Sequence, residues 1–341
     1  MQAPSYNLNQ IHPMPVLRFY ETYSANPVAI QNELEDGLLT ALAHTSPKYL
    51  YDALGSRLFD AITELPEYYP TRTEAAIFAA HSATLANTLP AGACMVDLGA
   101  GSCAKAAGLF AALAPSQYIA VDISAKYLRS VLTGLSEQHP SIGMAGVGMD
   151  FSSTLNLPAD LLAEATQRPV IGFYPGSSIG NFAPEEALAF LQRVQRLCAQ
   201  GKAGGGLLIG VDLVKAIDVL EPAYDDPLGV TGAFNLNMLR HINTLLGTNF
   251  DVRDWKHIAF FNTELSRIEM HLEARKPVSV RWNSSGTPRE RAFAAGERIH
   301  TENSYKWTVD KFSQLLKAAG FATTQSWTDE RGYFAVLWAG C

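Results

Sequence analysis

The stretch Met95-Val96-Asp97-Leu98-Gly99-Ala100-Gly101-Ser102 joins a short apolar run to a glycine turn, and an alanine-rich, helix-forming segment follows at 104–113. A strand, a glycine turn and a helix in this order present backbone N–H groups and a helix N-terminus to a ligand. A side chain at Gly99 or Gly101 would block the tight turn or hold the ligand away from the backbone. The stretch therefore predicts an α/β fold with a ligand bound at this turn.

A second apolar run, residues 118–121, ends in Asp122. This carboxylate follows the turn by about 20 residues, where it can accept hydrogen bonds from the hydroxyls of a ribose. We interpret the region as a nucleoside-cofactor site. The pattern Gly99-x-Gly101-x-x-Ala104 also fits the loose dinucleotide fingerprint, so the glycines alone do not identify the cofactor.

The composition limits the classes of function. The chain has 341 residues, 48% hydrophobic and 17% charged, which is enough for two domains or one large domain with insertions. Its net charge of −7 argues against nucleic-acid or anionic-membrane binding, because both need a basic face. The N-terminus does not resemble a signal peptide, and no apolar run approaches the ~20 residues that span a bilayer. We expect a cytoplasmic protein.

Cysteine and histidine spacing gives no sign of a metal site. The four cysteines are Cys94, Cys103, Cys198 and Cys341. They form no Cys-x-x-Cys pair, and the eight histidines form no His-x-His or His-x-x-x-His set. We therefore expect free thiols in a reducing compartment and no bound metal.

Strand and helix patterns alternate as far as residue 212. Apolar runs predict strands at 144–149, 170–174 and 207–212, and residues 125–138 predict a helix that His139-Pro140 ends. The small polar residues that follow the strand at 170–174 lie where open α/β sheets bind ligands.

The region before the glycine turn is less regular. Residues 1–16 predict a loose N-terminal arm, and the spacing of leucines in 24–44 predicts an amphipathic helix. The run Thr71-Arg72-Thr73-Glu74 is typical of a helix start, with Glu74 available to cap at Thr71.

From about residue 215 to residue 300 the alternation stops. Residues 266–272 and 278–282 predict antiparallel strands, and we infer an inserted substrate domain. The final part predicts a helix at 309–319 and a strand pair at 323–327 and 333–338. A terminal hairpin of this kind completes the seven-stranded sheet of class I methyltransferases, whereas a plain dehydrogenase would not need it.

Several long motifs occur in one order along the chain. They are Leu50-Tyr51-Asp52-Ala53-x-Gly55-Ser56-x-Leu58-Phe59, Leu65-Pro66-Glu67-Tyr68-Tyr69-Pro70-Thr71-Arg72-Thr73-Glu74, Gly176-Ser177-Ser178-Ile179-Gly180-Asn181, Ala223-Tyr224-Asp225-Asp226-x-x-Gly229-Val230-Thr231-x-Ala233-Phe234-Asn235, Arg267-Ile268-Glu269-Met270 and Thr301-Glu302-x-Ser304-x-Lys306. With them the chain resembles the histidine Nα-methyltransferase family of the ergothioneine pathway, which uses S-adenosylmethionine. These motifs are far more specific than the glycine turn.

The resemblance implies a Rossmann-like, class I methyltransferase fold with an additional α+β substrate domain. The methyltransferase domain would comprise residues 72–214 and 306–341, and the substrate domain 17–71 and 215–305. The residues implied for the cofactor are Tyr51, Gly99, Gly101, Lys105, Asp122, Asp150 and Phe151. The residues implied for the amino-acid substrate are Tyr68, Asn181, Tyr224, Met270, Glu302 and Ser304. S-adenosylhomocysteine would be the product, and we expect a monomer.

The residue types suit methylation of a histidine amine. The nucleophile must be the neutral amine, and Asn181 or Tyr51 can accept a hydrogen bond from it without a charge that would hold it as an ammonium. Glu302 and Ser304 lie two apart, so on a strand they share a face and can hold both nitrogens of an imidazole. A ring without polar atoms would leave a buried Glu302 unpaired. His300 precedes Glu302 by two residues, so a pocket role for His300 stays open.

Alternative functions remain at this point. One is an N-methyltransferase of another aromatic amino acid, such as a tryptophan derivative, on the same fold. Another is a nicotinamide-dependent oxidoreductase built on the Gly99 turn, and a third is a non-catalytic sensor of an adenosyl ligand. The addition of three methyl groups, which gives trimethylhistidine (hercynine), is an expectation from the resemblance.

Overall fold

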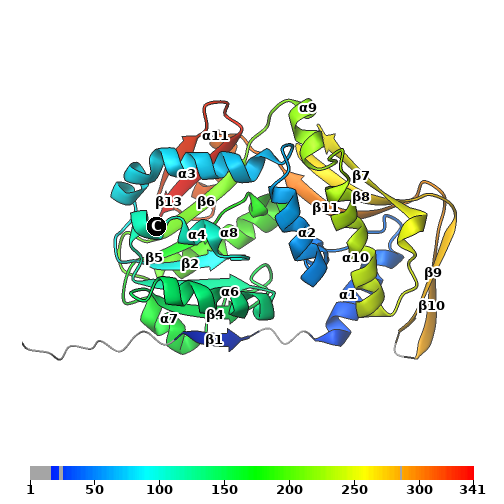
Figure 1. Ribbon diagram of the computed structural model, residues 1–341, viewed down its shortest axis with the longest axis horizontal. Helices are drawn as coiled ribbons and strands as arrows, with labels where there is room; N and C mark the ends of the chain where they lie inside the picture. Colours follow the sequence, from blue (N-terminus) through cyan, green and yellow to red (C-terminus); the bar gives the residue numbers. More distant parts are fainter. Residues whose placement is uncertain (1–16, 23–25, 285) are drawn as a thin grey trace, which may run out of the picture.

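The computed structural model describes residues 17–22, 26–284 and 286–341. The predicted N-terminal arm, residues 1–16, lies outside the described residues. Two groups of elements lie side by side, a large sheet with helices on both faces and a smaller group built on α10 (Val230–Leu246) (Figure 1).

The large sheet has eight strands in the order β1-β4-β3-β2-β5-β6-β13-β12. Their bounds are β1 Arg18–Glu21, β4 Gly143–Gly148, β3 Gln117–Asp122, β2 Cys94–Leu98, β5 Val170–Tyr174, β6 Gly206–Asp212, β13 Phe334–Gly340 and β12 Thr323–Thr328. The strands from β1 to β6 pair in parallel, while β13 runs antiparallel to both β6 and β12. The strands predicted from the sequence, including the terminal hairpin, are confirmed.

Strand β1 differs from the expectation in two ways. It adds an eighth strand to a sheet for which the sequence predicts seven, and it pairs in parallel with β4. The predicted boundaries place residues 17–71 with the substrate segments, but 18–21 belong to the large sheet. The reason is that β4 would otherwise present an open edge of unpaired backbone groups. The other boundaries stay a prediction.

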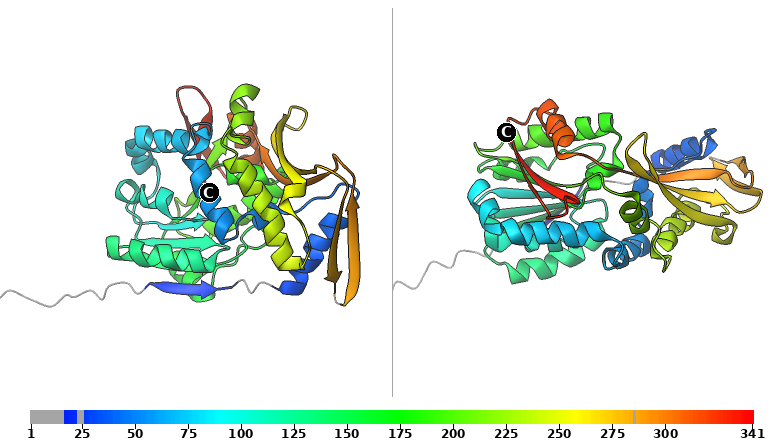
Figure 2. Two further views of the ribbon diagram at one scale, coloured as in Figure 1. Left: turned by 45° about the vertical axis from the view of Figure 1, so that its right-hand side comes forward. Right: turned by 90° about the horizontal axis from the view of Figure 1, so that it is seen from above.

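Helices cover both faces of the sheet and bury its apolar strands (Figure 2). One face packs against α7 (Ala159–Ala165), α8 (Pro184–Ala199) and α11 (Val309–Ala318). The other face packs against α3 (Tyr69–Thr88), α4 (Ala104–Ala107), α5 (Phe110–Leu113) and α6 (Ala125–Gln138). The carboxyl ends of the parallel strands therefore stay free to form a site.

A second hydrophobic core lies beside this sheet. Its helical elements are α1 (Pro27–Leu39), η1 (Pro47–Leu50), α2 (Ala53–Thr63), α9 (Ile217–Leu220), η3 (Glu221–Ala223), α10 and η4 (Val252–Asp254). They pack with the antiparallel sheet β11-β8-β7, with bounds Arg298–Tyr305, Arg267–Ala274 and Trp255–Asn262, and with the hairpin β9-β10, Val278–Ser284 and Thr287–Phe293. The antiparallel strands predicted at 266–272 and 278–282 are confirmed as β8 and β9, which belong to separate sheets.

Three helix predictions are corrected by the structure. The helix expected at 104–113 is two short helices, α4 and α5, separated at Gly108 and Leu109. Helix α3 begins at Tyr69, not at Thr71, and Glu74 is buried instead of capping the helix end. The helix expected over 24–44 is shorter, at Pro27–Leu39. In contrast, α6 has the predicted bounds.

Among the described residues, no helix combines the length and apolar character needed to cross a bilayer. The four cysteines all lie in described segments and are free thiols, as expected, with only Cys341 exposed.

A substitution at Gly210 in β6 tests the packing of the sheet. Gly210→Ala would place a Cβ 2.0 Å from Oε1 of Glu74 and 3.0 Å from the ring of Phe334. We expect the free energy of unfolding to fall by about 1–3 kcal/mol, because the buried carboxylate must move. Urea unfolding measures this change.

The control is Gly134→Ala, because no described atom lies within 4 Å of a Cβ at this position of α6. This variant should gain about 0.5–1 kcal/mol from reduced backbone freedom of the unfolded chain. Equal stabilities for the two variants would contradict the packing described for Gly210.

Candidate functional site

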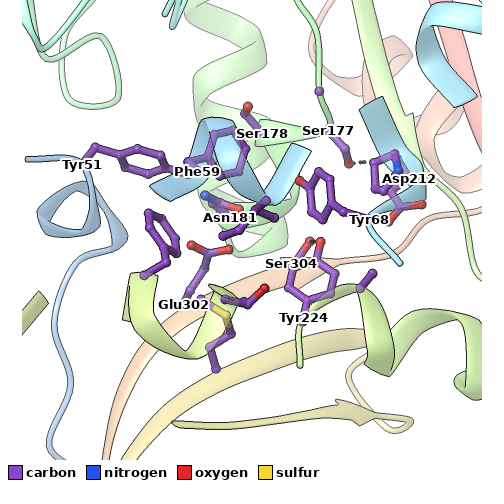
Figure 3. Close-up of a pocket in the computed structure, with 17 residues that line it drawn as sticks. Tyr51, Phe59, Tyr68, Ser177, Ser178, Asn181, Asp212, Tyr224, Glu302 and Ser304 are labelled. Atoms are coloured by element: carbon purple, nitrogen blue, oxygen red, sulfur yellow. Dashed lines mark hydrogen bonds between the residues drawn. The ribbon is translucent and has the colours of Figure 1, made fainter. Parts of the chain in front are cut away.

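A pocket of about 570 Å³, partly open to solvent, lies where the large sheet meets the second core. Every residue that the sequence assigns to the substrate or to catalysis lines it, and Figure 3 shows these side chains around one space. They are Tyr51, Tyr68, Asn181, Tyr224, Met270, Glu302 and Ser304. The sequence does not identify Phe59, Phe234 or Asp212, which also line the pocket.

The glycine turn has the geometry that its sequence predicts. Gly99 and Gly101 have φ of +76° and +50°, in the left-handed region that favours glycine. A Cβ at Gly99 would lie 3.3 Å from the ring of Phe151. The N–H of Gly101 donates to Oδ2 of Asp122 at 2.9 Å, so the end of β3 holds the turn after β2. Burial raises the pKa of Asp122, although backbone N–H donors from Ser124 and Gly101 oppose this effect.

Asp150 and Phe151 follow β4 and lie next to this turn. Oδ1 of Asp150 accepts from the backbone N–H of Ser152 at 3.1 Å. The ring of Phe151 packs edge-on against Tyr174 at 5.9 Å between centroids. Nζ of Lys48, in η1 of the second core, lies 3.8 Å from Oδ2 of Asp150. Five of the implied cofactor residues therefore lie at the carboxyl ends of β2, β3 and β4, whereas Lys105 lies on α4 and Tyr51 lines the neighbouring pocket. The five are Gly99, Gly101, Asp122, Asp150 and Phe151.

Glu74 links the cofactor turn to the pocket, and the sequence gives it a different role. Its Oε2 accepts from Nζ of Lys105 at 2.6 Å, and its Oε1 accepts from the N–H of Gly176 at 2.7 Å. Its side chain is 1% exposed, so the carboxylate depends on these partners. Lys105 is thus held between α4 and the Gly176 turn, which lines the pocket.

The turn after β5 carries Asn181 into the pocket on the short helix η2 (Ser178–Asn181). Ser177 has φ +59°, a strained conformation for a residue other than glycine. Its Oγ accepts from the N–H of Asp212 at 2.8 Å, which ties the turn to the end of β6. The strain is therefore held by a buried hydrogen bond beside the pocket.

Glu302 and Ser304 point into the pocket from β11, on the shared face that their spacing predicts. Oε2 of Glu302 is buried without a hydrogen-bond partner among the described residues. Burial raises the pKa of Glu302 to about 7, although the ammonium of Lys306 opposes the shift. An unpaired buried carboxyl that faces a pocket is available to bond a polar group of a ligand.

His300 does not join this pocket. A β-bulge between His300 and Glu302 pairs them with the neighbouring residues His271 and Met270 of β8, so they lie on opposite faces. His300 instead stacks on the ring of His271 at 4.6 Å, and its Nε2 lies 3.1 Å from the carbonyl oxygen of Glu302. The pocket role left open for His300 is wrong.

A buried ionic cluster lies behind the pocket. Asp212 accepts from Tyr69 at 2.7 Å, from Lys215 at 2.6 Å and from Lys306 at 2.7 Å. Burial alone would raise the pKa of Asp212, but the two ammonium groups lower it overall. Burial lowers the pKa of Lys215 to about 8. Tyr69 and Lys306 belong to motifs quoted above, but the sequence gives no signal that they meet at Asp212.

Aromatic side chains form the remaining wall. The ring of Tyr51 packs edge-on against Phe59 and Phe234, and that of Tyr68 against Phe59 and Tyr224. Burial raises the pKa values of Tyr51 and Tyr68 well above the ordinary value. These phenols therefore stay neutral and can donate or accept hydrogen bonds without adding charge.

Comparison with known proteins identifies the family. The model of a family described as histidine-specific, SAM-dependent methyltransferases matches residues 30–341. The chain belongs to this family.

Curated relatives agree with that assignment. The histidine N-alpha-methyltransferase of Mycolicibacterium smegmatis is 38% identical over 312 residues, covering 90% of this chain and 94% of the relative. The histidine N-alpha-methyltransferase of Mycobacterium tuberculosis is 36% identical over 316 residues, covering 92% of this chain and 95% of the relative. Ergothioneine biosynthesis protein 1 of Neurospora crassa is 30% identical over 82% of this chain, which matches 31% of that longer protein. The chain is therefore a SAM-dependent methyltransferase with a class I fold.

One group of side chains in this methyltransferase has the composition of a metal site. Potential ligand atoms of Glu269, His271 and His300 lie within 4.8 Å of one another. The two imidazole rings are stacked with only 23° between their planes, so their in-plane lone pairs do not converge. Glu269 is already bonded to Arg267 and Asn262. The geometry favours a hydrogen-bonded cluster, and the sequence-based expectation of no metal stays a prediction.

Glu302 makes stability depend on pH. In the native enzyme this carboxyl stays protonated up to about pH 7, whereas in the unfolded chain its pKa is 4.5. Between these values the native state binds more protons, so this group's contribution to stability falls as pH rises. Glu302→Gln removes this dependence on pH. As pH rises from about 4.5 to about 7, the free energy of unfolding of the variant minus that of the wild type should therefore increase by up to about 3 kcal/mol.

Urea unfolding of both proteins at about pH 5 and about pH 8 measures the change. Burial also raises the pKa of Asp97 to about 7, so this residue titrates in the same pH range. Because Asp97 is present in both proteins, its effect cancels when their free energies of unfolding are subtracted. Parallel stability curves would show that Glu302 ionises normally.

Proposed function

We propose that this enzyme transfers methyl groups from S-adenosylmethionine to the α-amino group of L-histidine. Three transfers would give trimethylhistidine, hercynine, for ergothioneine biosynthesis. The observation that carries the substrate assignment is Glu302, a buried carboxyl with an orphaned oxygen that shares the pocket with Ser304. Histidine is also the substrate named for the family and for its curated relatives.

The residues at the strand ends fit the cofactor. The left-handed turn at Gly99 leaves a space that a Cβ would fill, against the ring of Phe151. We propose that Asp122 holds the ribose, that Asp150 and Phe151 meet the adenine, and that Gly101 and Lys105 complete this site with Tyr51. When bound, S-adenosylmethionine supplies a methyl group already activated by its sulfonium.

The pocket residues would orient the substrate amine, which is the nucleophile, rather than activate it by removing a proton. Positioning of reacting groups can supply several kcal/mol, within a ceiling of roughly 7–11 kcal/mol. Asn181 and the neutral phenol of Tyr51 can accept from the amine without charge. Tyr68 and Tyr224 would hold the rest of the amino acid, and Met270 would pack against the apolar part of its ring.

The ring end of the pocket favours imidazole over other aromatic rings. A tryptophan ring has one nitrogen, which only donates, and a tyrosine ring has none, so neither offers the two ring nitrogens that would pair with Glu302 and Ser304. A buried polar group would therefore stay unpaired. The methyltransferase of another aromatic amino acid is therefore the alternative to be tested. From the net charge of −7 we further propose that the enzyme binds no nucleic acid. We also propose a cytoplasmic monomer without a bound metal.

The cofactor assignment predicts the behaviour of Asp122→Ala. Loss of the carboxylate should raise the dissociation constant for S-adenosylhomocysteine about 10- to 100-fold, because charge-assisted hydrogen bonds to the ribose are lost. Isothermal titration calorimetry measures it. The control is Asp160→Asn at the start of α7, where the carboxylate bonds Tyr20 near β1 and binding should not change. Tight binding of NAD to the wild type would contradict the assignment.

The substrate assignment predicts selective turnover. With labelled S-adenosylmethionine and a panel of amino acids, histidine should be the preferred acceptor, and product masses should show one, two and three methyl additions. Glu302→Ala should lower kcat/KM for histidine by about 100-fold or more, because the ring loses a buried charged partner.

Glu273→Gln is the matched control for Glu302→Ala. Glu273 lies in the same three-stranded sheet but is bonded to Lys256 and Arg298 instead of lining the pocket. Its histidine turnover should match the wild type. Unchanged histidine turnover in Glu302→Ala, or a preference of the wild type for tryptophan, would refute the proposed substrate.

A further inference from the structure

We propose that Lys306 is a positioning residue that makes the ring end of the pocket select the neutral form of an imidazole. The proposal rests on the proposed function, because it concerns how Ser304 and Tyr224 meet the substrate ring. It assigns a role to a residue that does not itself line the pocket.

Lys306 is fully buried directly behind two pocket hydroxyls. Its side chain is 0% exposed. Its Nζ donates to the hydroxyl oxygens of Tyr224 and Ser304, each at 2.8 Å, and lies 2.7 Å from Oδ2 of Asp212. An ammonium has three N–H donors and no acceptor, so these three partners use its full hydrogen-bonding capacity.

The two hydroxyls also bond each other, since Oγ of Ser304 lies 2.8 Å from the hydroxyl of Tyr224. Between them they carry two hydrogens, and one of these is used in this mutual bond. Lys306 cannot accept the other hydrogen, because an ammonium only donates. One hydroxyl hydrogen is therefore left to point into the pocket, and the serine and tyrosine together act as a donor toward the ligand.

The opposite partner at the ring end is Glu302. Burial raises the pKa of its carboxyl, but a bonded ring N–H favours the ionised form, which only accepts. One donor and one acceptor match the neutral imidazole, which has one N–H and one lone-pair nitrogen. A protonated imidazole has two N–H groups, and one of them would face the hydroxyl donor and the positive charge of Lys306. Glu302 attracts that protonated ring, so the two buried charges compete. Lys306 and the mutual bond occupy three of the four hydroxyl lone pairs, and the free hydroxyl hydrogen together with the positive charge of Lys306 decides for the neutral ring.

Other charged and titratable groups near the ring end act weakly or in the same direction. Asp212 lies behind Lys306 and is bonded to it and to Lys215. Tyr51 and Tyr68 face the same space as neutral phenols, because burial raises their pKa values. The hydrogen bonds of Lys306 thus distinguish this pocket from one in which a lone carboxylate would bind an imidazolium.

Nitrogen-15 NMR of ring-labelled histidine, bound together with S-adenosylhomocysteine, tests the proposal. A protonated and a lone-pair ring nitrogen give well-separated signals. In the wild type we expect one nitrogen of each kind from about pH 8 down to about pH 6, below the ordinary pKa of histidine of about 6.5. In Lys306→Met both hydroxyls can accept, so the bound ring should carry two N–H groups at about pH 6, and histidine should bind about tenfold more weakly.

Lys215→Met is the matched control. It removes the other ammonium from Asp212, and this ammonium contacts neither Ser304 nor Tyr224. Its bound ring should give the wild-type signals. Lys306→Gln, which retains a polar head group with an acceptor, is the second variant if Lys306→Met does not fold, and it should also admit the protonated ring.

Two protonated nitrogens in the wild-type complex would overturn the proposal, with or without a folded variant. Wild-type signals in a folded Lys306 variant would also overturn it. Neither result bears on whether histidine is the substrate, because turnover of histidine by the wild type tests that separately. Absence of histidine methylation would instead refute the proposed function.

Discussion

The buried carboxylate of Asp212 is the constraint on which the pocket depends. A carboxylate taken out of water costs several kcal/mol unless donors surround it. Here the donors come from three segments, with Tyr69 at the start of α3, Lys215 after β6 and Lys306 after β11. Because Tyr69 belongs to the second core and Asp212 ends a strand of the large sheet, satisfying one charge fixes the two parts relative to each other. The pocket lies at this junction.

The sequence predicts the large sheet well because its signals are local. Strand β5 and helix α6 have the predicted bounds, since continuous apolar runs, a helical period and a terminating His139-Pro140 are all read within a few residues. The glycine turn is equally local, because Gly99 and Gly101 must adopt positive φ wherever the rest of the chain lies. The predicted pocket residues also gather around one space, although the family resemblance, not their spacing, suggested most of them.

What the sequence misses are contacts between distant residues and shifts of register. The sequence predicts Glu74 as a helix cap, but its carboxylate bonds the N–H of Gly176, 102 residues away. Likewise, the hydroxyl of Tyr69 bonds Asp212, 143 residues away. The β-bulge between His300 and Glu302 places these two residues on opposite faces of the sheet, and the alternation of residues along a strand cannot predict such a shift. Strand β1 is too short to show a pattern and is defined by the open edge of β4. The roles assigned to individual site residues stay proposals for the same reason.

The distribution of charge within the pocket explains how one enzyme can meet two opposite demands. An amine acts as a nucleophile only without its extra proton, so an anion beside it would favour the unreactive ammonium. The side chains proposed to face the amine, Asn181 and Tyr51, are uncharged, and burial keeps the phenol protonated. The ionised groups are held at the ring end or behind it, where Asp212 is paired with two lysines. Glu302 brings a second carboxyl into the pocket besides the paired Asp212, and burial keeps the carboxyl of Glu302 partly protonated near neutral pH. A ring N–H that bonds Glu302 favours the ionised form of this carboxyl. The negative charge therefore forms where the ring is recognised, while the amine end of the pocket stays free of fixed charge.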